Sequence, residues 1–325
     1  MSGPFDAELG RGREFDRIRR MAARWQARAH GLGDDCAFIE AGGEVLAVSM
    51  DLAVEGVHFR RDWLTPAEIG YRAAAAALSD LAAVAAEPMA LLLAVGVPEG
   101  EPDETLDALA DGVGDAAADA GALIVGGDLT RAAQLVVDCC VIGRAPAPVR
   151  RSGARPGDRL VVTGALGGPR AAIAAWEAGE EPPAEARARF VRPAPRHAAA
   201  RFLASHRARA MVDLSDGLAG DLGHLLAASA VGATVWVDRL PVLPAAAAAA
   251  ARAGEPAWRF AAGSGEEYEL LAALPGDVTD EELAHAPVAV TVVGVFEETP
   301  GLRAVSGGGG HAVTLPAGYD HFRPS

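Results

Sequence analysis

Carboxylates follow several segments of this sequence that are predicted to be strands. They are Asp51 after residues 44–50, Asp128 after residues 122–125 and two glycines, and Asp213 and Asp216 after residues 211–212. In a compact sheet, strand ends gather at one rim, where ligand sites are usually built. Carboxylates brought to one rim repel one another unless cations lie between them. Because oxygen ligands without clusters of histidine or cysteine favour Mg²⁺ or Ca²⁺ over zinc, the pattern predicts a site for hard divalent cations.

Two further acidic positions join this set. Asp34 and Asp35 precede a predicted strand at Cys36, and Asp80 lies on an apolar face of a predicted helix, where an unpaired charge is costly. An aspartate that follows a strand has an alternative interpretation, as an ordinary turn residue held by local hydrogen bonds. For Asp80 the alternative is an ion pair with an arginine such as Arg72.

Glycines and the choice of basic residue point to phosphate. Gly126-Gly127 before Asp128, and Gly164 with Gly167-Gly168, allow the backbone to approach an anion closely and to begin a helix there. The chain contains no lysine, so a P-loop lysine, a kinase strand lysine and Schiff-base chemistry are excluded. Any bound phosphate must be held by arginine, such as Arg151, by backbone amides or by metal ions. Together these features suit metal-bridged polyphosphate binding.

The composition limits the class of protein. Half of the 325 residues are hydrophobic, which excludes an intrinsically disordered chain. The 44 acidic side chains against 29 basic ones give a formal charge of −15, which argues against binding to nucleic acid or an anionic membrane. Three cysteines offer no disulfide framework or zinc spacing, and no apolar stretch reaches the roughly 20 residues of a membrane helix. We expect a cytoplasmic protein without a signal peptide.

Helices and strands alternate in the sequence pattern, which predicts the fold class α/β (α+β). In the first half the expected helices are 14–28, 65–86 and 101–120, and the expected strands are 36–39, 44–50, 89–97, 122–125 and 134–143. Gly42-Gly43 joins the first two strands, and Thr65-Pro66-Ala67-Glu68 is a capping box with proline at the first helical position. In the second half the expected strands are 159–163, 211–213, 234–237, 268–273 and 288–295, with helices between them.

A change of composition separates the two halves. Residues 144–159 contain three prolines and a cluster of arginines, which is typical of a domain boundary. We therefore predict two domains, residues 1–145 and residues 146–325.

Ten short segments match a known enzyme family in order, from near one end of the chain to the other. They are 12–15 (GREF), 33–37 (GDDCA), 49–51 (SMD), 54–59 (VEGVHF), 78–83 (LSDLAA), 126–131 (GGDLTR), 151–158 (RSGARPGD), 213–218 (DLSDGL), 265–270 (GEEYEL) and 318–322 (GYDHF). With this set the chain resembles the bacterial thiamine-monophosphate kinases, within the aminoimidazole ribonucleotide synthetase-like superfamily. Each motif alone is weak evidence, whereas the ordered set is highly specific.

The resemblance implies ATP-dependent phosphorylation of thiamine monophosphate to thiamine diphosphate. It also implies a homodimer formed by the N-terminal domain, with several Mg²⁺ ions and ATP bound between the two domains. The implied Mg²⁺ ligands are Asp35, Ser49, Met50, Asp51, Asp80, Asp128, Asp213 and Asp216, of which Asp51, Asp128 and Asp216 are the implied catalytic residues. The implied contacts to ATP are Gly127, Asp128, Arg151 and Ser215, and those to the thiamine phosphate are His58, Glu266 and Tyr319.

Three departures from the family pattern concern the site. Met50 stands where the family usually has threonine, so only its backbone carbonyl is available to a metal. Leu129 and Ala132 alter the turn after Gly126-Gly127, and the alanine run 73–77 lacks a usual asparagine. None of these changes removes a carboxylate, so the resemblance still implies the activity.

Other interpretations stay open at this point. The chain could be another ATP-using enzyme of the superfamily, or a catalytically silent paralogue that binds nucleotide or metal. His58 has an alternative as a hydrogen-bonded loop histidine, Glu266 as a solvated charge and Tyr319 as a residue that docks the tail on the core.

Overall fold

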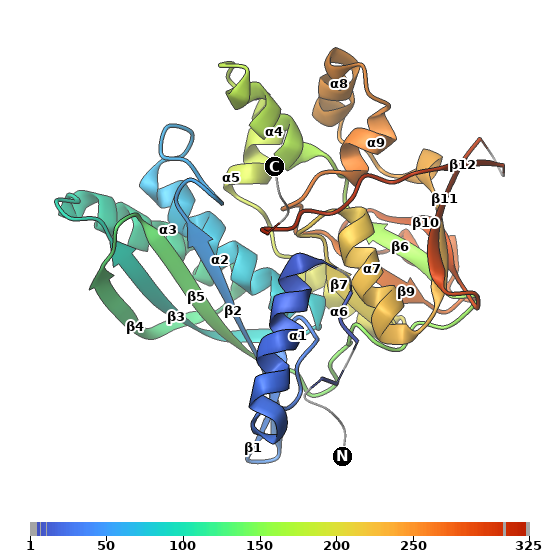
Figure 1. Ribbon diagram of the computed structural model, residues 1–325, viewed down its shortest axis with the longest axis horizontal. Coiled ribbons are helices and arrows are strands. Elements are labelled where there is room, and N and C mark those ends of the chain that lie inside the picture. The colour runs from blue at the N-terminus through green and yellow to red at the C-terminus, as the bar shows by residue number, and fades with distance from the viewer. Residues whose placement is uncertain (1–4, 7, 11, 308–309, 323–325) are drawn as a thin grey trace.

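The first half of the chain folds into a five-stranded sheet, here called the first sheet, with strand order β1-β2-β5-β3-β4 (Figure 1). Its elements are α1 (Arg13–Trp25), β1 (Ala37–Ala41), β2 (Glu44–Val54), α2 (Pro66–Ala83), β3 (Glu87–Val97), α3 (Asp103–Ala120), β4 (Leu123–Arg131) and β5 (Val136–Arg144). The computed structural model describes residues 5–6, 8–10, 12–307 and 310–322.

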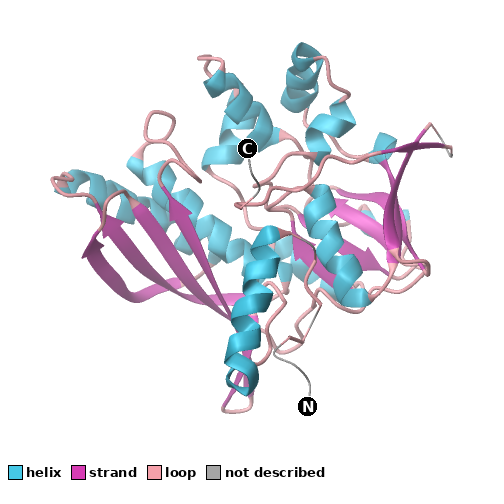
Figure 2. Ribbon diagram, in the orientation of Figure 1, coloured by secondary structure: helices cyan, strands magenta, loops and turns pink. Residues whose placement is uncertain are grey.

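The second half forms a seven-stranded sheet, the second sheet, with strand order β12-β11-β8-β10-β6-β9-β7. Its strands are β6 (Arg159–Thr163), β7 (Ala210–Asp213), β8 (Gly232–Trp236), β9 (Leu270–Leu274), β10 (Val290–Glu297), β11 (Gly301–Ser306) and β12 (His311–Val313). Its helices are α4 (Gly168–Glu177), α5 (Ala184–Val191), α6 (His197–Ser205), α7 (Leu218–Ser229), α8 (Pro244–Ala253), α9 (Ala257–Ala262) and α10 (Asp280–Leu283). The expected mixed α/β fold is therefore confirmed (Figure 2), while the boundary at residue 145 stays a prediction.

Helix α2 joins the two halves and begins as predicted. The Thr65 side chain accepts a hydrogen bond from the backbone N–H of Glu68, and the Glu68 side chain accepts one from that of Thr65, so the capping box is confirmed. The alanine run 73–77 is buried because α2 packs against β2, β5 and α3 and also against β7, α5 and α6 of the second half. Small residues permit this close packing: a Cβ on Gly70 would lie 2.0 Å from the carbonyl oxygen of Leu109 on α3.

The two faces of the first sheet differ in burial. Along β5, Val137, Cys139 and Val141 are buried, whereas Asp138 and Cys140, which point to the other side, are partly exposed. Helices α2 and α3 cover the buried face (Figure 2). The opposite face is called the open face, and it carries exposed apolar side chains, among them Met50, Leu52 and Leu123.

Two strands are longer than predicted, and each of them includes an aspartate that was expected to follow it. Strand β2 continues to Val54 and β4 to Arg131, so Asp51 and Asp128 lie inside strands rather than after them. The predictions ended too early because polar residues and glycines suggested turns. These residues are instead paired, Asp51 with Cys139 and Asp128 with Ala94. The hairpin of β1 and β2 about Gly42-Gly43 is confirmed.

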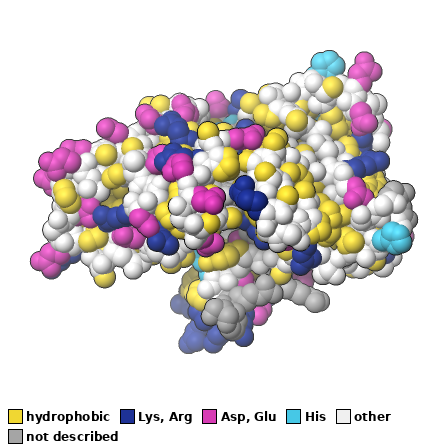
Figure 3. Space-filling model, turned by 90° about the horizontal axis from the view of Figure 1, so that it is seen from above, with side chains coloured by type: hydrophobic (Ala, Val, Ile, Leu, Met, Phe, Trp, Pro, Cys, Tyr) yellow, Lys and Arg dark blue, Asp and Glu magenta, His cyan; other side chains and the backbone are white. Residues whose placement is uncertain are grey.

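Charge is distributed unevenly over the surface. The outer face of α3 carries exposed acidic side chains, namely Asp103, Glu104, Asp107, Asp111 and Asp115. Figure 3 shows acidic side chains gathered toward the end of the molecule that α3 forms. Such a surface repels polyanions. Within the part of the chain that the structure describes, no helix has the length and apolar character needed to span a membrane.

Candidate active site

Three carboxylates from distant parts of the chain meet where α2 reaches the second sheet. Asp35 comes from the loop before β1, Asp80 from α2 and Asp213 from the end of β7. One oxygen of each lies within 4.8 Å of the others. We call these three residues the acidic cluster. An all-oxygen donor set at this spacing fits a hard divalent cation such as Mg²⁺.

Two serine hydroxyls hold the acidic cluster in place. Ser49 on β2 donates to Oδ2 of Asp80 at 2.6 Å, and Ser79 on α2 donates to Oδ2 of Asp213 at 2.6 Å. The second bond joins the first half of the chain to the second. Ser49 is among the site residues predicted from the sequence, whereas Ser79 is not, although Ser79 stands next to Asp80 in the matched motif.

The electrostatics of the site favour bound cations. Burial raises the pKa of Asp213 to about 7, with Asp35 and Asp51 adding to the effect. Burial also raises the pKa of Asp51 and of Asp216 to about 6. For Asp80, burial and then Asp213, Asp51 and Asp35 raise the pKa well above its ordinary value. A cation between these groups would stabilise their ionised forms.

Arg151 supplies a counter-charge within the acidic cluster. Its Nη2 and Nε donate to the two oxygens of Asp35 at 2.7 and 3.2 Å, a bidentate pair. Its backbone N–H donates to Oδ1 of Asp34 at 3.2 Å, while buried Oδ2 of Asp34 has no partner among the described residues. Burial, with the charge of Asp35, raises the pKa of Asp34 to about 6. The structure thus joins a predicted ATP contact to a predicted metal ligand.

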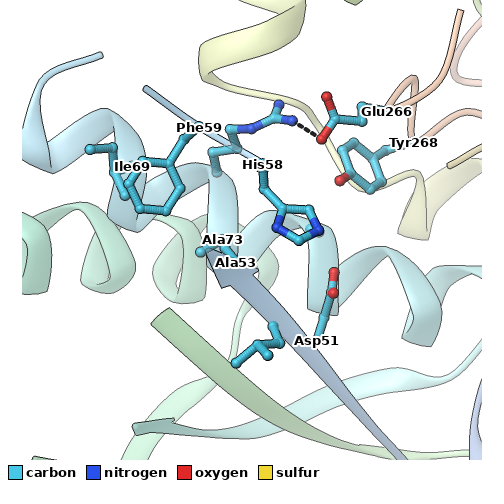
Figure 4. A pocket seen from close by; sticks show the side chains of 11 residues that line it. Asp51, Ala53, His58, Phe59, Ile69, Ala73, Glu266 and Tyr268 are labelled. Carbon is cyan, nitrogen blue, oxygen red and sulfur yellow. Dashed lines mark ion pairs between the residues drawn. The ribbon is translucent and has the colours of Figure 1, made fainter. Parts of the chain in front are cut away.

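A pocket beside the acidic cluster is lined by two of the predicted substrate contacts, His58 and Glu266, together with Asp51 (Figure 4). The His58 Nδ1 accepts a hydrogen bond from the backbone N–H of Val54 at 3.0 Å, so the Nε2 atom is the one available to a ligand. Burial lowers the pKa of His58, which favours the neutral ring. The pocket therefore combines a neutral hydrogen-bonding ring with two carboxylates.

Arg72 forms part of the wall of this pocket, a role that was not predicted from the sequence. It forms an ion pair with Glu266, donates to the carbonyl oxygen of Phe190 at 2.6 Å and lies 3.8 Å from the centre of the Phe190 ring. The alternative pairing of Arg72 with Asp80 is therefore wrong, since Asp80 takes the Ser49 hydroxyl instead. An arginine inside a buried alanine-rich helix was the available signal, because a buried charge requires a partner.

Two predicted site residues, Asp128 and Gly127, lie away from the acidic cluster, on the edge strand β4 of the first sheet. Met50 lies on β2 between Ser49 and Asp51, and its side chain points to the open face with 65% of its surface exposed. Three strand spacings separate β4 from β2, or about 14 Å. The pairing of Asp128 with Ala94, and of Ala94 with Asp138, places the Asp128 side chain on the open face. A single chain does not bring Asp128 to Asp51.

The second glycine cluster approaches the chain's own carboxylates. A Cβ on Gly164 would lie 2.0 Å from Oε1 of Glu269, and the Gly167 backbone N–H donates to Oε1 of Glu267 at 2.5 Å. Glu269 is completely buried and paired with Arg189 and Arg196. The expectation that this cluster receives a phosphate is therefore corrected, since the anion beside it belongs to the protein.

Both halves of the chain match one family. Residues 33–145 match "AIR synthase related protein, N-terminal domain" and residues 155–306 match "AIR synthase related protein, C-terminal domain". The chain therefore belongs to the AIR synthase related family. The fold is also that of the hydrogenase maturation protein HypE, which is 20% identical with a TM-score of 0.72 over 87% of this chain and 92% of HypE.

Closer similarity identifies the branch of this family. The thiamine-monophosphate kinase of Mycobacterium tuberculosis is 38% identical over 83% of this chain and 82% of its own length. That of Salmonella typhimurium is 36% identical over 95% of this chain and 96% of its own length. AaThiL complexed with AMPPCP and TMP is 27% identical, with a TM-score of 0.86 over 96% of this chain and 97% of that one. The chain belongs to the thiamine-monophosphate kinase family.

Proposed function

We propose that this protein transfers the γ-phosphate of ATP to thiamine monophosphate, which gives thiamine diphosphate and ADP. The observation that carries this proposal is the acidic cluster lying directly beside a pocket lined by His58 and Glu266. The similarity to AaThiL complexed with AMPPCP and TMP, over nearly the whole chain, supports it. The protein is then an ATP-dependent kinase whose acceptor is itself a phosphate group.

The acceptor needs no general base. The second pKa of a phosphate monoester is about 6, so its oxygen is already ionised at neutral pH. The reaction forms a bond from this oxygen to the γ-phosphorus and breaks the bond from that phosphorus to the oxygen retained by ADP. The main obstacle is the repulsion between two polyanions, and a protein with a formal charge of −15 does not relieve it by its net charge.

When bound, several Mg²⁺ ions would neutralise the phosphate oxygens and align the transfer. Asp35, Asp80 and Asp213 would hold such ions, and Ser49 and Ser79 would fix the orientation of the last two carboxylates. The flanking carboxylates Asp51 and Asp216 are proposed to contact the ions from the side of the substrate pocket and of the 213–218 turn. This arrangement fits the residues present, because every donor is a hard oxygen.

The nucleotide and the thiamine phosphate are proposed to occupy neighbouring parts of this site. Arg151 and Ser215 are proposed to contact ATP, and Arg151 would share its guanidinium between Asp35 and a phosphate. His58, Glu266 and Tyr319 are proposed to contact thiamine monophosphate, whose thiazolium ring is cationic and suits the carboxylate of Glu266. The Arg72 ion pair would hold that carboxylate in place.

A homodimer would account for the open face and for Asp128. The open face and β4 expose large apolar side chains, among them Leu52 at 47%, Leu123 at 71% and Leu129 at 64%. An apolar sheet face of this kind is typical of a protein interface. We propose that a second copy of the chain covers this face, and that Asp128 and Gly127 then serve the metal and ATP site of the partner subunit.

The decisive experiment supplies thiamine monophosphate and ATP with Mg²⁺ and follows the products by phosphorus NMR. We expect the signals of a diphosphate linkage on thiamine, together with ADP. Release of inorganic phosphate without that linkage would overturn the proposal in favour of another ATP-using member of the superfamily. Binding of nucleotide with no turnover would indicate a catalytically silent paralogue.

A further inference from the structure

The first and last of the ten matched segments contact each other. The backbone N–H of Arg13 donates to Oδ2 of Asp320 at 2.8 Å, although the two residues are 307 positions apart. The Arg13 guanidinium reaches the carbonyl oxygen of Phe322 at 3.5 Å, and the Arg17 guanidinium lies 3.8 Å from the centre of the Phe322 ring. The proposed function uses Tyr319 alone among these two segments, so it leaves this contact without a role.

The same tail is attached to the active site. The backbone N–H of Tyr319 donates to the carbonyl oxygen of Asp216 at 2.8 Å. A Cβ on Gly318 would lie 2.9 Å from the Cα of Gly220, so the tail lies directly on the start of α7. The His321 ring is 4.9 Å from the Tyr319 ring and 5.0 Å from the His58 ring. Residues 319 and 321 therefore stand between the 216–220 turn and the substrate pocket.

Asp320 holds this tail by capping α1. The residue before the helix, Gly12, has no side chain that could satisfy the free backbone N–H groups of the first turn. The Asp320 carboxylate, from the opposite end of the chain, acts as the cap: its Oδ2 accepts from the backbone N–H of Arg13. Its Oδ1 accepts from the backbone N–H of Phe322 at 2.9 Å. Gly12 has a φ of 154°, a backbone conformation that residues with a side chain rarely adopt, and a Cβ there would lie 3.3 Å from this carboxylate. A carboxylate at a helix N-terminus is stabilised by both hydrogen bonds and the helix dipole.

We propose that Asp320 is a positioning residue for the substrate. By clasping the tail to α1 it sets the His321 ring against His58 and the Tyr319 ring against His321, so that the thiamine phosphate meets an ordered aromatic wall. We call Arg13, Arg17, Asp320 and Phe322 the terminal clasp. The inference rests on the proposed function only in taking the pocket beside His58 as the place of thiamine monophosphate.

The test compares Asp320→Ala and Asp320→Asn with Asp16→Ala as the control. Asp16 is an exposed acid on the same helix whose ion pair, to Arg19 at 3.5 Å, does not involve the tail. For Asp320→Ala we expect the KM for thiamine monophosphate to rise about tenfold, with kcat and the KM for ATP within about twofold, since contacts that bind substrate and transition state equally are lost. Asp320→Asn keeps an oxygen that accepts from Arg13, so it should stay within about threefold of the wild type. Asp16→Ala should match the wild type.

Amide hydrogen exchange provides a readout that does not depend on activity. In Asp320→Ala, the first-turn amides of α1 and the amides of residues 319–322 should exchange faster than in the wild type. Unchanged exchange in both segments would overturn the clasp. A fall in the kcat of Asp320→Ala with no change in the KM for either substrate would overturn the positioning role. The contact between the tail and α1 would still stand. If exchange is faster in Asp320→Ala than in the wild type, but the wild type does not phosphorylate thiamine monophosphate, the proposed function is refuted and the clasp is not.

Discussion

Strand β2 serves two regions with opposite chemistry. Ser49 and Asp51 point toward α2 and the acidic cluster, where carboxylates are crowded and partly or wholly buried. Met50 and Leu52, the alternate residues, point to the open face, where 65% and 47% of their surfaces are exposed. Because side chains alternate along a strand, a step of one residue separates a site that needs cations from a surface that suits a protein partner.

The two regions depend on different partners. In the acidic cluster Asp35 is paired with Arg151, while Asp80 and Asp213 have raised pKa values, so bound cations would stabilise the ionised forms of these two carboxylates. The open face carries the carboxylates of Asp128 and Asp138 but is otherwise largely apolar, and burial of its exposed apolar side chains would favour association with a second chain. We therefore expect that substitutions on this one strand can perturb ion binding and the proposed dimer separately.

The largest expected effect is that of Asp51→Asn. This change keeps the volume of the side chain and removes one negative charge beside the cluster, so we expect the rate to fall roughly a hundredfold or more. The melting temperature without metal should hold or rise, because carboxylate repulsion is relieved. Steady-state turnover at saturating ATP and Mg²⁺, with thermal unfolding in EDTA, measures both.

Asp107→Asn is the matched control for Asp51→Asn. Asp107 is an exposed acid on the outer face of α3, away from both the acidic cluster and the open face. Its loss should leave turnover within about threefold of the wild type, as for most substitutions outside a site. Wild-type turnover in Asp51→Asn would return Asp51 to a purely structural role.

Mixed dimers test whether the two regions meet across an interface. Asp51→Asn and Asp128→Asn should each be nearly inactive as pure proteins. If Asp128 serves the partner subunit, a heterodimer of the two variants has one intact site, and an equal random mixture should recover about a quarter of the wild-type rate. Co-expression with two different tags, followed by tandem purification, isolates the heterodimer. A heterodimer no more active than its parents would contradict the shared site.

The stability of the metal-free protein should depend on pH in an unusual direction. The folded-state pKa is about 7 for Asp213 and about 6 for Asp51 and Asp216. These values exceed the ordinary aspartate value of about 3.9, so the folded state keeps protons that the unfolded state has released, and stability falls as pH rises from about 4 to about 8. Melting in EDTA across this range should show the fall, and Mg²⁺ should stabilise most at the high end. A flat profile in EDTA would contradict the raised values.

Met50→Thr is expected to have the smallest effect. The change adds a hydroxyl beside Asp51 in sequence but on the open face in space, and it removes exposed apolar surface. We expect activity to be preserved or raised, by no more than about threefold. A loss above about tenfold in a folded protein would show that the Met50 side chain itself packs against the partner subunit. Turnover and size-exclusion chromatography together distinguish these outcomes.

Local sequence signals predicted the parts of the fold that depend on local contacts. The capping box at Thr65 and Glu68 and the hairpin about Gly42-Gly43 are confirmed, because each rests on residues only a few positions apart. The acidic set was also recognisable from the sequence, because a carboxylate in apolar surroundings costs free energy unless it has a partner. Asp35, Asp80 and Asp213 are brought together by the fold as that pattern predicts.

Only the tertiary structure decided which face each residue serves. By sequence, Asp51 and Asp128 were equivalent acids after apolar strands, yet they lie on opposite faces of one sheet. The face is fixed by the register of β2, β5, β3 and β4, which depends on packing between residues far apart in the chain. For the same reason the partner of Arg72 and the contact of Asp320 with α1 could not be derived from spacing: each joins side chains or backbone groups that only the completed fold places within reach.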